Sequence, residues 1–274
     1  MANLRILYNN IADLASSVTA VTEVNATMGA SKLLTEVKTE VLRSTNTSLT
    51  ITYNWSLDQN INCVILPCTN ITNTGTIRIK LYDSLNVLLY DSTAIQAVES
   101  TQLYSGTNTY NVNLFSYGFF SKTAVWLPNT INNIRKLEII ISDPSNTTGY
   151  IDCSRVLAGV YWSPTYNITN GMQLYSVDDS STSRTNAGNL VSNRGFLYDK
   201  LSFNFALLTD SDKAELYKIS KYIGTNKNFF VSIFPEASNT NEEHDYMIYG
   251  KRSNSIFSYK LFGYYDYSME IISW

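Results

Sequence analysis

His244 is the only histidine of the 274-residue chain, so every Ser-His or Cys-His catalytic scheme would have to use it. It stands in the run NEEHDY, residues 241–246, where Glu242, Glu243 and Asp245 surround it with carboxylates. The run lacks the spaced oxygen ligands of a recognised calcium loop. We interpret it as a solvated acidic loop before a strand, and we expect no metal there.

Asp178 and Asp179 form the only adjacent pair of aspartates, and paired carboxylates could serve a glycosidase. Neighbours along a strand point to opposite faces, however, so nothing selects these two as a catalytic pair. The chain also contains no GxSxG, P-loop or GxGxxG motif. We expect a protein without cofactor or enzymatic activity. A polysaccharide hydrolase assembled from scattered acids is kept as an alternative, with Asp178 or Asp179 as its first candidate.

The three cysteines, Cys63, Cys68 and Cys153, are an odd number without a CxxC pair, and we interpret them as small buried hydrophobic residues. Charged residues make up only 16% of the chain and the net charge is −3, which argues against a nucleic-acid-binding surface. The N-terminus lacks the apolar core of a secretion signal, and no segment reaches the roughly 18 apolar residues of a membrane span. These features predict a soluble product made in the cytoplasm.

Aromatic residues are abundant, with 20 tyrosines and four tryptophans. Flat rings near loops or strand ends stack on sugar faces or anchor protein contacts, although most such rings pack in cores and interfaces. The candidates for carbohydrate or interface contact are Tyr53, Trp55, Trp126, Tyr161, Trp162 and Tyr166.

The elements that must position these residues are mainly β-strands. Residues 49–53 and 76–82 alternate apolar and polar side chains, as half-buried antiparallel strands do, and 61–66 is a short apolar run. Turn residues at 56–60, 69–75, 83–86 and 105–108 separate them, and 136–142 and 155–162 add two strands. Many short strands with such turns predict a sandwich or barrel.

Pro164 marks a domain border, because proline removes a hydrogen-bond donor and holds the preceding residue in an extended conformation. Beyond it, residues 210–223 form the one convincing helix, with Thr209 or Ser211 as cap and Gly224 as its end. Strands are expected at 172–177, 199–208, 228–234, 245–249, 256–262 and at the C-terminus. We therefore predict a β-sandwich over residues 1–163 and a β-rich α+β domain with one main helix over 164–274.

Several stretches of the first half together resemble discoidin-like, or galactose-binding-like, modules: SKLL (31–34), VLRS (41–44), LTITY (49–53) and CVIL (63–66). The resemblance implies a jelly-roll sandwich with Arg43 near its ligand-facing edge. Leu42 stands where that family has a tryptophan. Arg43 therefore has two candidate roles: to donate hydrogen bonds to the carbonyls of the turn at 45–48, or to contact a sugar beside Tyr53 or Trp55. We favour the structural role, because the stacking platform is missing.

The chain also resembles tail proteins of long-tailed bacteriophages, in MANLRILY (1–8), ISDPSNTTGYI (141–151), SRV (154–156) with Gly159, and LSF (201–203). This resemblance implies a structural protein of the virion tail or baseplate, assembled as a ring or trimer with other phage tail proteins and made in the host cytoplasm. Low charge and abundant tyrosine suit such a subunit. The alternative is a carbohydrate-binding module that recognises host surface glycans, and the second alternative is the glycan-cleaving enzyme.

Overall fold

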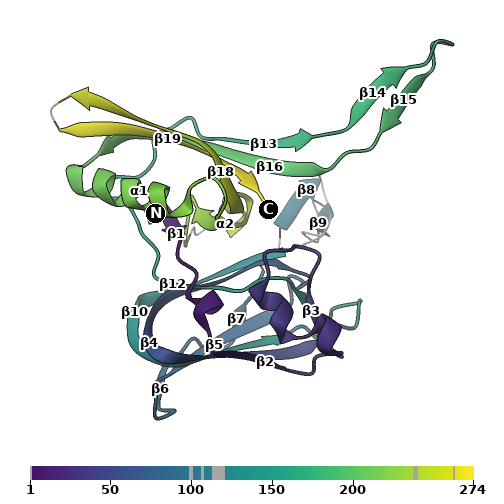
Figure 1. The fold of residues 1–274 in the computed structure, drawn as a ribbon. Coiled ribbons are helices and arrows are strands. Elements are labelled where there is room, and N and C mark those ends of the chain that lie inside the picture. The colour runs from purple at the N-terminus through teal and green to yellow at the C-terminus, as the bar shows by residue number, and fades with distance from the viewer. Residues whose placement is uncertain (1, 99–100, 106–107, 113–120, 237–239, 262) are drawn as a thin grey trace. The chain divides into compact units, whose positions relative to one another are not determined.

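The computed structural model describes residues 2–98, 101–105, 108–112, 121–236, 240–261 and 263–274. The predicted mainly β fold is confirmed, and its longest strands pair antiparallel (Figure 1). The chain forms two compact units. We call residues 9–162 with 236–247 the sandwich unit, and residues 1–8, 163–235 and 248–274 the sheet unit.

Two segments depart from the predicted division at residues 163 and 164. β1 (Arg5–Leu7) belongs to the sheet unit, because it pairs antiparallel with β17 (Asn228–Ser232) and satisfies its main-chain groups there. Residues 236–247, which include α2 (Thr240–Asp245), belong to the sandwich unit. The assignment of both segments depends on contacts between distant parts of the chain. The proline at the predicted domain border does not encode such contacts.

The sandwich unit is built around two long strands, β4 (Ser48–Thr69) and β10 (Ser121–Ser142), of 22 residues each. The first part of β4 lies between the last part of β10 and β2 (Ser17–Val21), while its second part pairs with the start of β10 and with β12 (Leu157–Gly159). Three register shifts of β10 between Trp126 and Lys136 separate the two parts. Each long strand thus contributes to both layers.

The turn predicted at 56–60 is wrong, because this stretch continues β4 through the register shifts, with Gln59 opposite Ile134 of β10. The turn predicted at 105–108 lies partly outside the described residues. The other elements of the unit are η1 (Ile11–Leu14), η2 (Ala26–Met28), η3 (Ala30–Leu34), β3 (Leu42–Arg43), β5 (Thr76–Tyr82), β6 (Leu88–Asp91), β7 (Ile95–Gln96), β8 (Thr101–Ser105), β9 (Asn108–Val112) and β11 (Asp152–Cys153).

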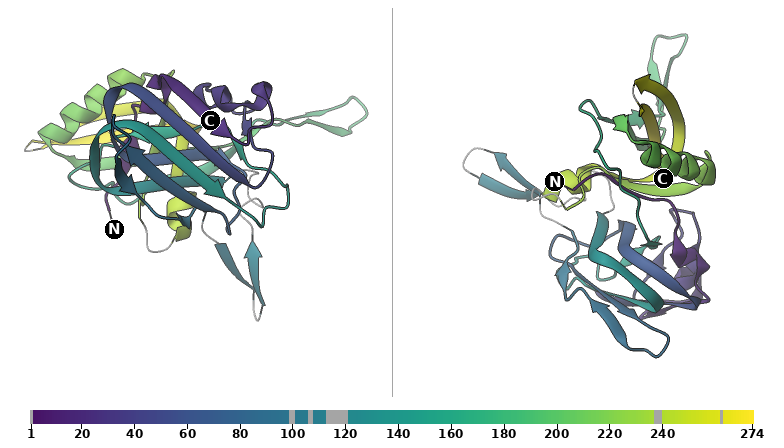
Figure 2. Two further views of the ribbon diagram at one scale, coloured as in Figure 1. Left: turned by 90° about the horizontal axis from the view of Figure 1, so that it is seen from below. Right: turned by 90° about the vertical axis from the view of Figure 1, so that its left-hand side faces the viewer.

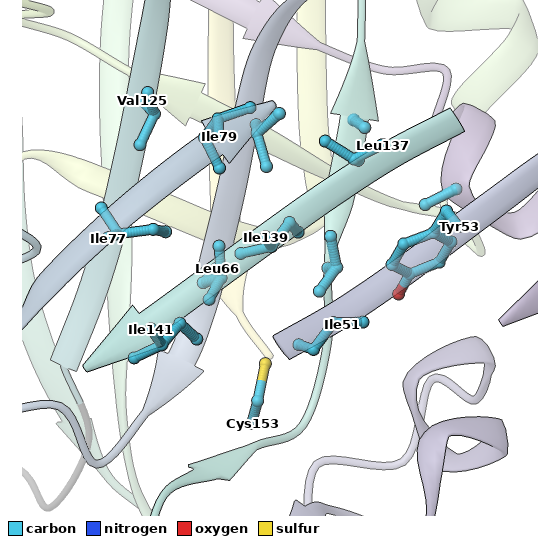
Figure 3. Close-up of a cluster of buried hydrophobic side chains, with 14 of the residues drawn as sticks. Ile51, Tyr53, Leu66, Ile77, Ile79, Val125, Leu137, Ile139, Ile141 and Cys153 are labelled. Carbon is cyan, nitrogen blue, oxygen red and sulfur yellow. The ribbon is translucent and has the colours of Figure 1, made fainter. Parts of the chain in front are cut away.

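One core fills the sandwich unit, and alternation in the sequence places its side chains. Leu49 and Ile51 on β4, Ile77 on β5 and Ile139 on β10 are all fully buried and belong to one cluster. Figure 3 shows these strands directing their labelled side chains into a common interior. Cys153 lies in the same core, and all three cysteines are buried, as predicted.

The sheet unit holds a six-stranded sheet in the order β1-β17-β18-β19-β16-β13. Its further strands are β13 (Gln173–Asp178), β16 (Leu197–Leu208), β18 (Met247–Leu261) and β19 (Tyr264–Ser273), so the two strands predicted at 245–249 and 256–262 are one. A hairpin of β14 (Ser181–Arg184) and β15 (Leu190–Asn193) extends from β13 and β16 (Figure 2).

The predicted helix is confirmed as α1 (Asp210–Ile223). The Thr209 hydroxyl accepts a hydrogen bond from the Asp212 N–H, and Gly224 ends the helix at φ 57°. One face of the helix is fully buried and carries Leu216, Ile219 and Ile223. Among the helices of the described residues, none is long and apolar enough to cross a membrane.

Candidate functional site

Arg43 forms a bidentate ion pair with Asp152, its cross-strand neighbour between β3 and β11. The Arg43 Nε and Nη2 atoms each donate to one carboxylate oxygen of Asp152 at 2.8 Å. The guanidinium also lies over the ring of Tyr150, 4.0 Å from the ring centroid. The hydrogen bonds to Asp152 raise the pKa of Arg43. The structure thus places a cation, a carboxylate and an aromatic ring side by side.

The partner of Arg43 differs from the main-chain carbonyls that we expected for its structural role. Arg43 does not close the turn at 45–48 through main-chain carbonyls in the contacts of the described residues. The Ser44 hydroxyl donates to the Asn46 carbonyl, and the Asn46 side chain accepts from the Ser48 N–H at 2.9 Å. A carboxylate matches the guanidinium fork in two bonds, which explains why Arg43 turns to Asp152.

Buried polar side chains fix the loops behind this group. Asn70 donates to the Thr148 hydroxyl at 3.2 Å and to the Tyr150 carbonyl at 2.9 Å, and it accepts from the Asp152 N–H at 2.7 Å. The Asn146 amide in turn donates to the Asn70 carbonyl at 3.0 Å. Each of these bonds joins segments that lie more than 70 residues apart in the sequence. The network therefore holds residues 148–152 against β4.

We call Arg43, Thr148, Tyr150 and Asp152 the binding rim. The side chain of Arg43 is 30% exposed and that of Asp152 is 12% exposed, while Tyr150 is half-buried and Thr148 is exposed. The rim offers hydrogen-bond donors and acceptors next to a ring at the surface, held by a network that exists before any ligand binds. Tyr150 and Asp152 were not singled out in the sequence, where nothing marks them as neighbours of Arg43.

Tyr53 and Trp55 are corrected to core residues. Tyr53 is fully buried and Trp55 is 4% exposed, with their rings stacked at 6.2 Å between centroids. Trp55 Nε1 donates to the Ile11 carbonyl at 2.8 Å, and burial raises the pKa of Tyr53 well above its usual value. Neither ring presents a face to a ligand. The spacing of these residues indicates their burial, because residues 49, 51, 53 and 55 share the inward face of β4.

Trp126 and Tyr161 contact each other outside the core cluster, because Trp126 alternates along β10 with the core residues Val125 and Leu127. Their rings pack edge to face at 5.3 Å between centroids, and Trp126 Nε1 donates to the carboxylate of Glu243 in α2 at 2.5 Å. Both rings are half-buried, as is Trp162. Tyr166 lies in the sheet unit and is 48% exposed. The seven candidates therefore do not form one site.

His244 is corrected from a solvated loop to a half-buried position in α2, where its side chain is 16% exposed. Among the described residues neither ring nitrogen has a hydrogen-bond partner, and Nδ1 lies 3.6 Å from a carboxylate oxygen of Asp245. Burial and the nearby charge of Lys122 lower the pKa of His244 against the effect of Asp245. Lys122 also donates to the Met247 carbonyl at 2.9 Å, which fastens the end of this segment to β10.

The acid pair Asp178 and Asp179 lies exposed where β13 ends. Hydrogen bonds from Ser180 lower the pKa of Asp178, whereas a general acid needs a raised value. Within the part of the chain that the structure describes, no group of three metal-binding side chains comes together.

No family model matches the chain, and no curated protein matches it. Solved structures that resemble it include a fucose-binding module of Streptococcus pneumoniae, with 13% identity over 56% of this chain and 99% of that chain, at a TM-score of 0.37. Chitosan-binding module 1 of a chitosanase/glucanase from Paenibacillus sp. IK-5 has 14% identity, covers 56% of this chain and 99% of that chain, and gives a TM-score of 0.38.

A third structure, from Clostridium perfringens in complex with GalNAc-β-1,3-galactose, has 11% identity over 53% of this chain and 94% of that chain, with a TM-score of 0.36. At identities this low and TM-scores below 0.5, the ligand of this chain has to be inferred from its own residues. The role in a bacteriophage tail stays a prediction.

Proposed function

We propose that the sandwich unit is a non-catalytic carbohydrate-binding module that contacts a glycan at the binding rim. The supporting observation is the Tyr150 ring beneath the Arg43 guanidinium, beside the Asp152 carboxylate. Sugar rings have apolar faces that pack on aromatic rings and hydroxyls that pair with such donors and acceptors. The buried Asn70 network keeps these groups in place, so little ordering cost attaches to binding.

Arg43 and Asp152 already use part of their hydrogen-bonding capacity on each other, through two hydrogen bonds. A sugar would share their remaining lone pairs and N–H groups rather than replace the ion pair. We therefore expect weak affinity for a single rim, in the millimolar to high-micromolar range, and stronger binding when several copies are displayed together.

The second candidate function is the structural role in a virion tail or baseplate. It is favoured by exposed apolar side chains on the sheet unit around the β14–β15 hairpin, where Phe196 is 84%, Leu197 72% and Leu190 62% exposed. Exposed apolar groups of this kind mark contacts with other proteins. In this role the chain would bind other tail proteins, and glycan contact would be an added property of the same subunit.

A glycan array tests the first proposal. The full chain is used, because residues 236–247 belong to the sandwich unit, and it is tetramerised on streptavidin to raise avidity. Tyr150→Leu keeps an apolar surface beneath Arg43 but removes the aromatic face, whereas Tyr166→Leu makes the same change at an exposed tyrosine of the sheet unit. We expect binding that Tyr150→Leu abolishes and Tyr166→Leu preserves. Silence of the wild-type protein on every glycan, or equal loss in both variants, contradicts the proposal.

A further inference from the structure

The hairpin formed by β14 and β15 is a two-stranded sheet that stands apart from the larger sheet (Figure 1). Four residue pairs make up its ladder, from Ser181 with Asn193 to Arg184 with Leu190, and all eight residues are exposed. A two-stranded hairpin without a packed face is only marginally stable in water, and three or more strands are needed for stability. The hairpin is held at its base, where it continues from β13 and β16, but among the described residues no further strand lies beside β14.

The outer edge of this hairpin is open. β13 is the last strand of the six-stranded sheet, and β14 pairs only with β15 in the described part of the chain. The edge contains no proline or lysine, which are the residues that usually block pairing between sheet edges. Its charges are two carboxylates at one end, Asp178 and Asp179, and one guanidinium at the other, Arg184.

The spacing of these charges fits an antiparallel pair of two identical strands. Residues directly opposite each other in such a pair lie on the same face, so one residue must face its own copy across the twofold axis that runs between the two strands. With the two Ser181 residues facing each other, Asp178, the last residue of β13, lies three residues before this point and Arg184, the last residue of β14, three residues after it. The pairing requires residues 179 and 180, which lie between the two strands, to be extended along the paired edge. Asp178 of each copy then faces Arg184 of the other, and the contact forms twice.

We propose that the β14 edge pairs antiparallel with the β14 edge of a second copy of this chain, centred on Ser181. The two hairpins then form one four-stranded sheet in which every inner strand has two neighbours. Leu190 lies across the ladder from Arg184 on the same face, so it flanks each ion pair and limits its contact with water. Arg194, which acts on Asp178 within its own chain, is the competing partner. This inference is independent of glycan binding.

Sedimentation equilibrium of the full chain tests the pairing, with circular dichroism to verify the fold of each variant. We expect a reversible dimer that tightens at low salt, because the cross-strand charges are exposed. Arg184→Asp and Asp178→Arg each place like charges opposite each other and should raise the dissociation constant at least tenfold. The double variant D178R/R184D exchanges the partners and should return it to within threefold of wild type.

Lys251→Asp serves as the matched control, since it makes the same charge reversal at an exposed position of β18, away from the hairpin. It should leave the dissociation constant unchanged. A wild-type chain that stays monomeric at the highest soluble concentration overturns the proposal. So does a dimer that is insensitive to both single variants, or one that the double variant fails to restore.

Discussion

Asp143 is a fully buried carboxylate at the end of β10, and its removal should be among the most destabilising changes in the sandwich unit. Its Oδ2 accepts from the Thr72 N–H at 2.7 Å, and its Oδ1 accepts from the Thr72 hydroxyl at 2.7 Å and the Thr74 hydroxyl at 3.3 Å. These bonds hold the 69–75 turn against the loop that leads to the binding rim.

The expected loss of stability depends on which hydrogen-bond donors lose their acceptor. Asp143→Ala strands the main-chain N–H of Thr72, at about 1 to 3 kcal/mol, and removes bonds to a charged acceptor worth about 1.5 to 3 kcal/mol. We expect a loss of about 3 to 5 kcal/mol. In Asp143→Asn, the side-chain carbonyl can accept from the Thr72 N–H. The amide group can donate to the Thr72 and Thr74 hydroxyls once these hydroxyls rotate their hydrogens away. It should cost only about 1 to 2 kcal/mol.

Urea unfolding followed by tryptophan fluorescence measures both losses. Trp55, Trp126 and Trp162 all lie in the sandwich unit, so they dominate the signal over Trp274 of the sheet unit. Ser145→Ala, an exposed change in the same loop, is the control and should stay within about 0.5 kcal/mol of wild type. A cost below about 1 kcal/mol for Asp143→Ala, or equal costs for alanine and asparagine, would refute the reasoning.

Three further changes test separate parts of the structure. Hydrogen bonds from Arg78 help hold the pKa of Asp91 at about 2, so the stability they add is present above the ordinary value of 3.8 and is lost as pH falls through 2. In Arg78→Gln the Asp91 pKa, measured by NMR titration, should rise towards 3.8, and an unchanged value would count against the pair. Because the pKa of His244 is lowered, its protonation opposes the fold, so stability should fall as pH drops below 6.5. His244→Gln should flatten this dependence in urea titrations at pH 7 and 5, and equal slopes would contradict the assignment. Gly224→Ala forces a side chain into φ 57°, so the sheet unit should lose about 1 to 2 kcal/mol in thermal unfolding, and no loss would mean that the helix end relaxes.

Local signals account for the elements that the sequence predicted correctly. The helix at 210–223 is bounded by a cap at Thr209 and by Gly224, and both act within one turn of the chain. The strand at 76–82 follows from alternation alone. The continuation of β4 through residues 56–60 could not be predicted, because it depends on the pairing of the flanking parts of β4 with β10, a strand distant in the sequence.

In the candidate site, too, features set by the local sequence were predictable and features set by distant contacts were not. The alternation of residues on β4 places Tyr53 and Trp55 on the same buried face as Leu49. This alternation predicts their positions better than the tendency of aromatic rings to mark surface binding sites. The partner of Arg43 was not predictable, because Asp152 lies 109 residues away and only the sandwich brings it near. His244 was misplaced for a related reason: its acidic neighbours suggested solvent, whereas α2 packs against β10.

We propose that the chain contacts a sugar at the binding rim and not at the aromatic pair Trp126 and Tyr161. The most direct measurement is an NMR titration of the isotope-labelled full chain with the oligosaccharide that gives the strongest array signal. We expect saturable amide shifts confined to residues 43–48 and 148–152. Saturable shifts centred on Trp126 and Tyr161, or shifts that never saturate, would contradict it.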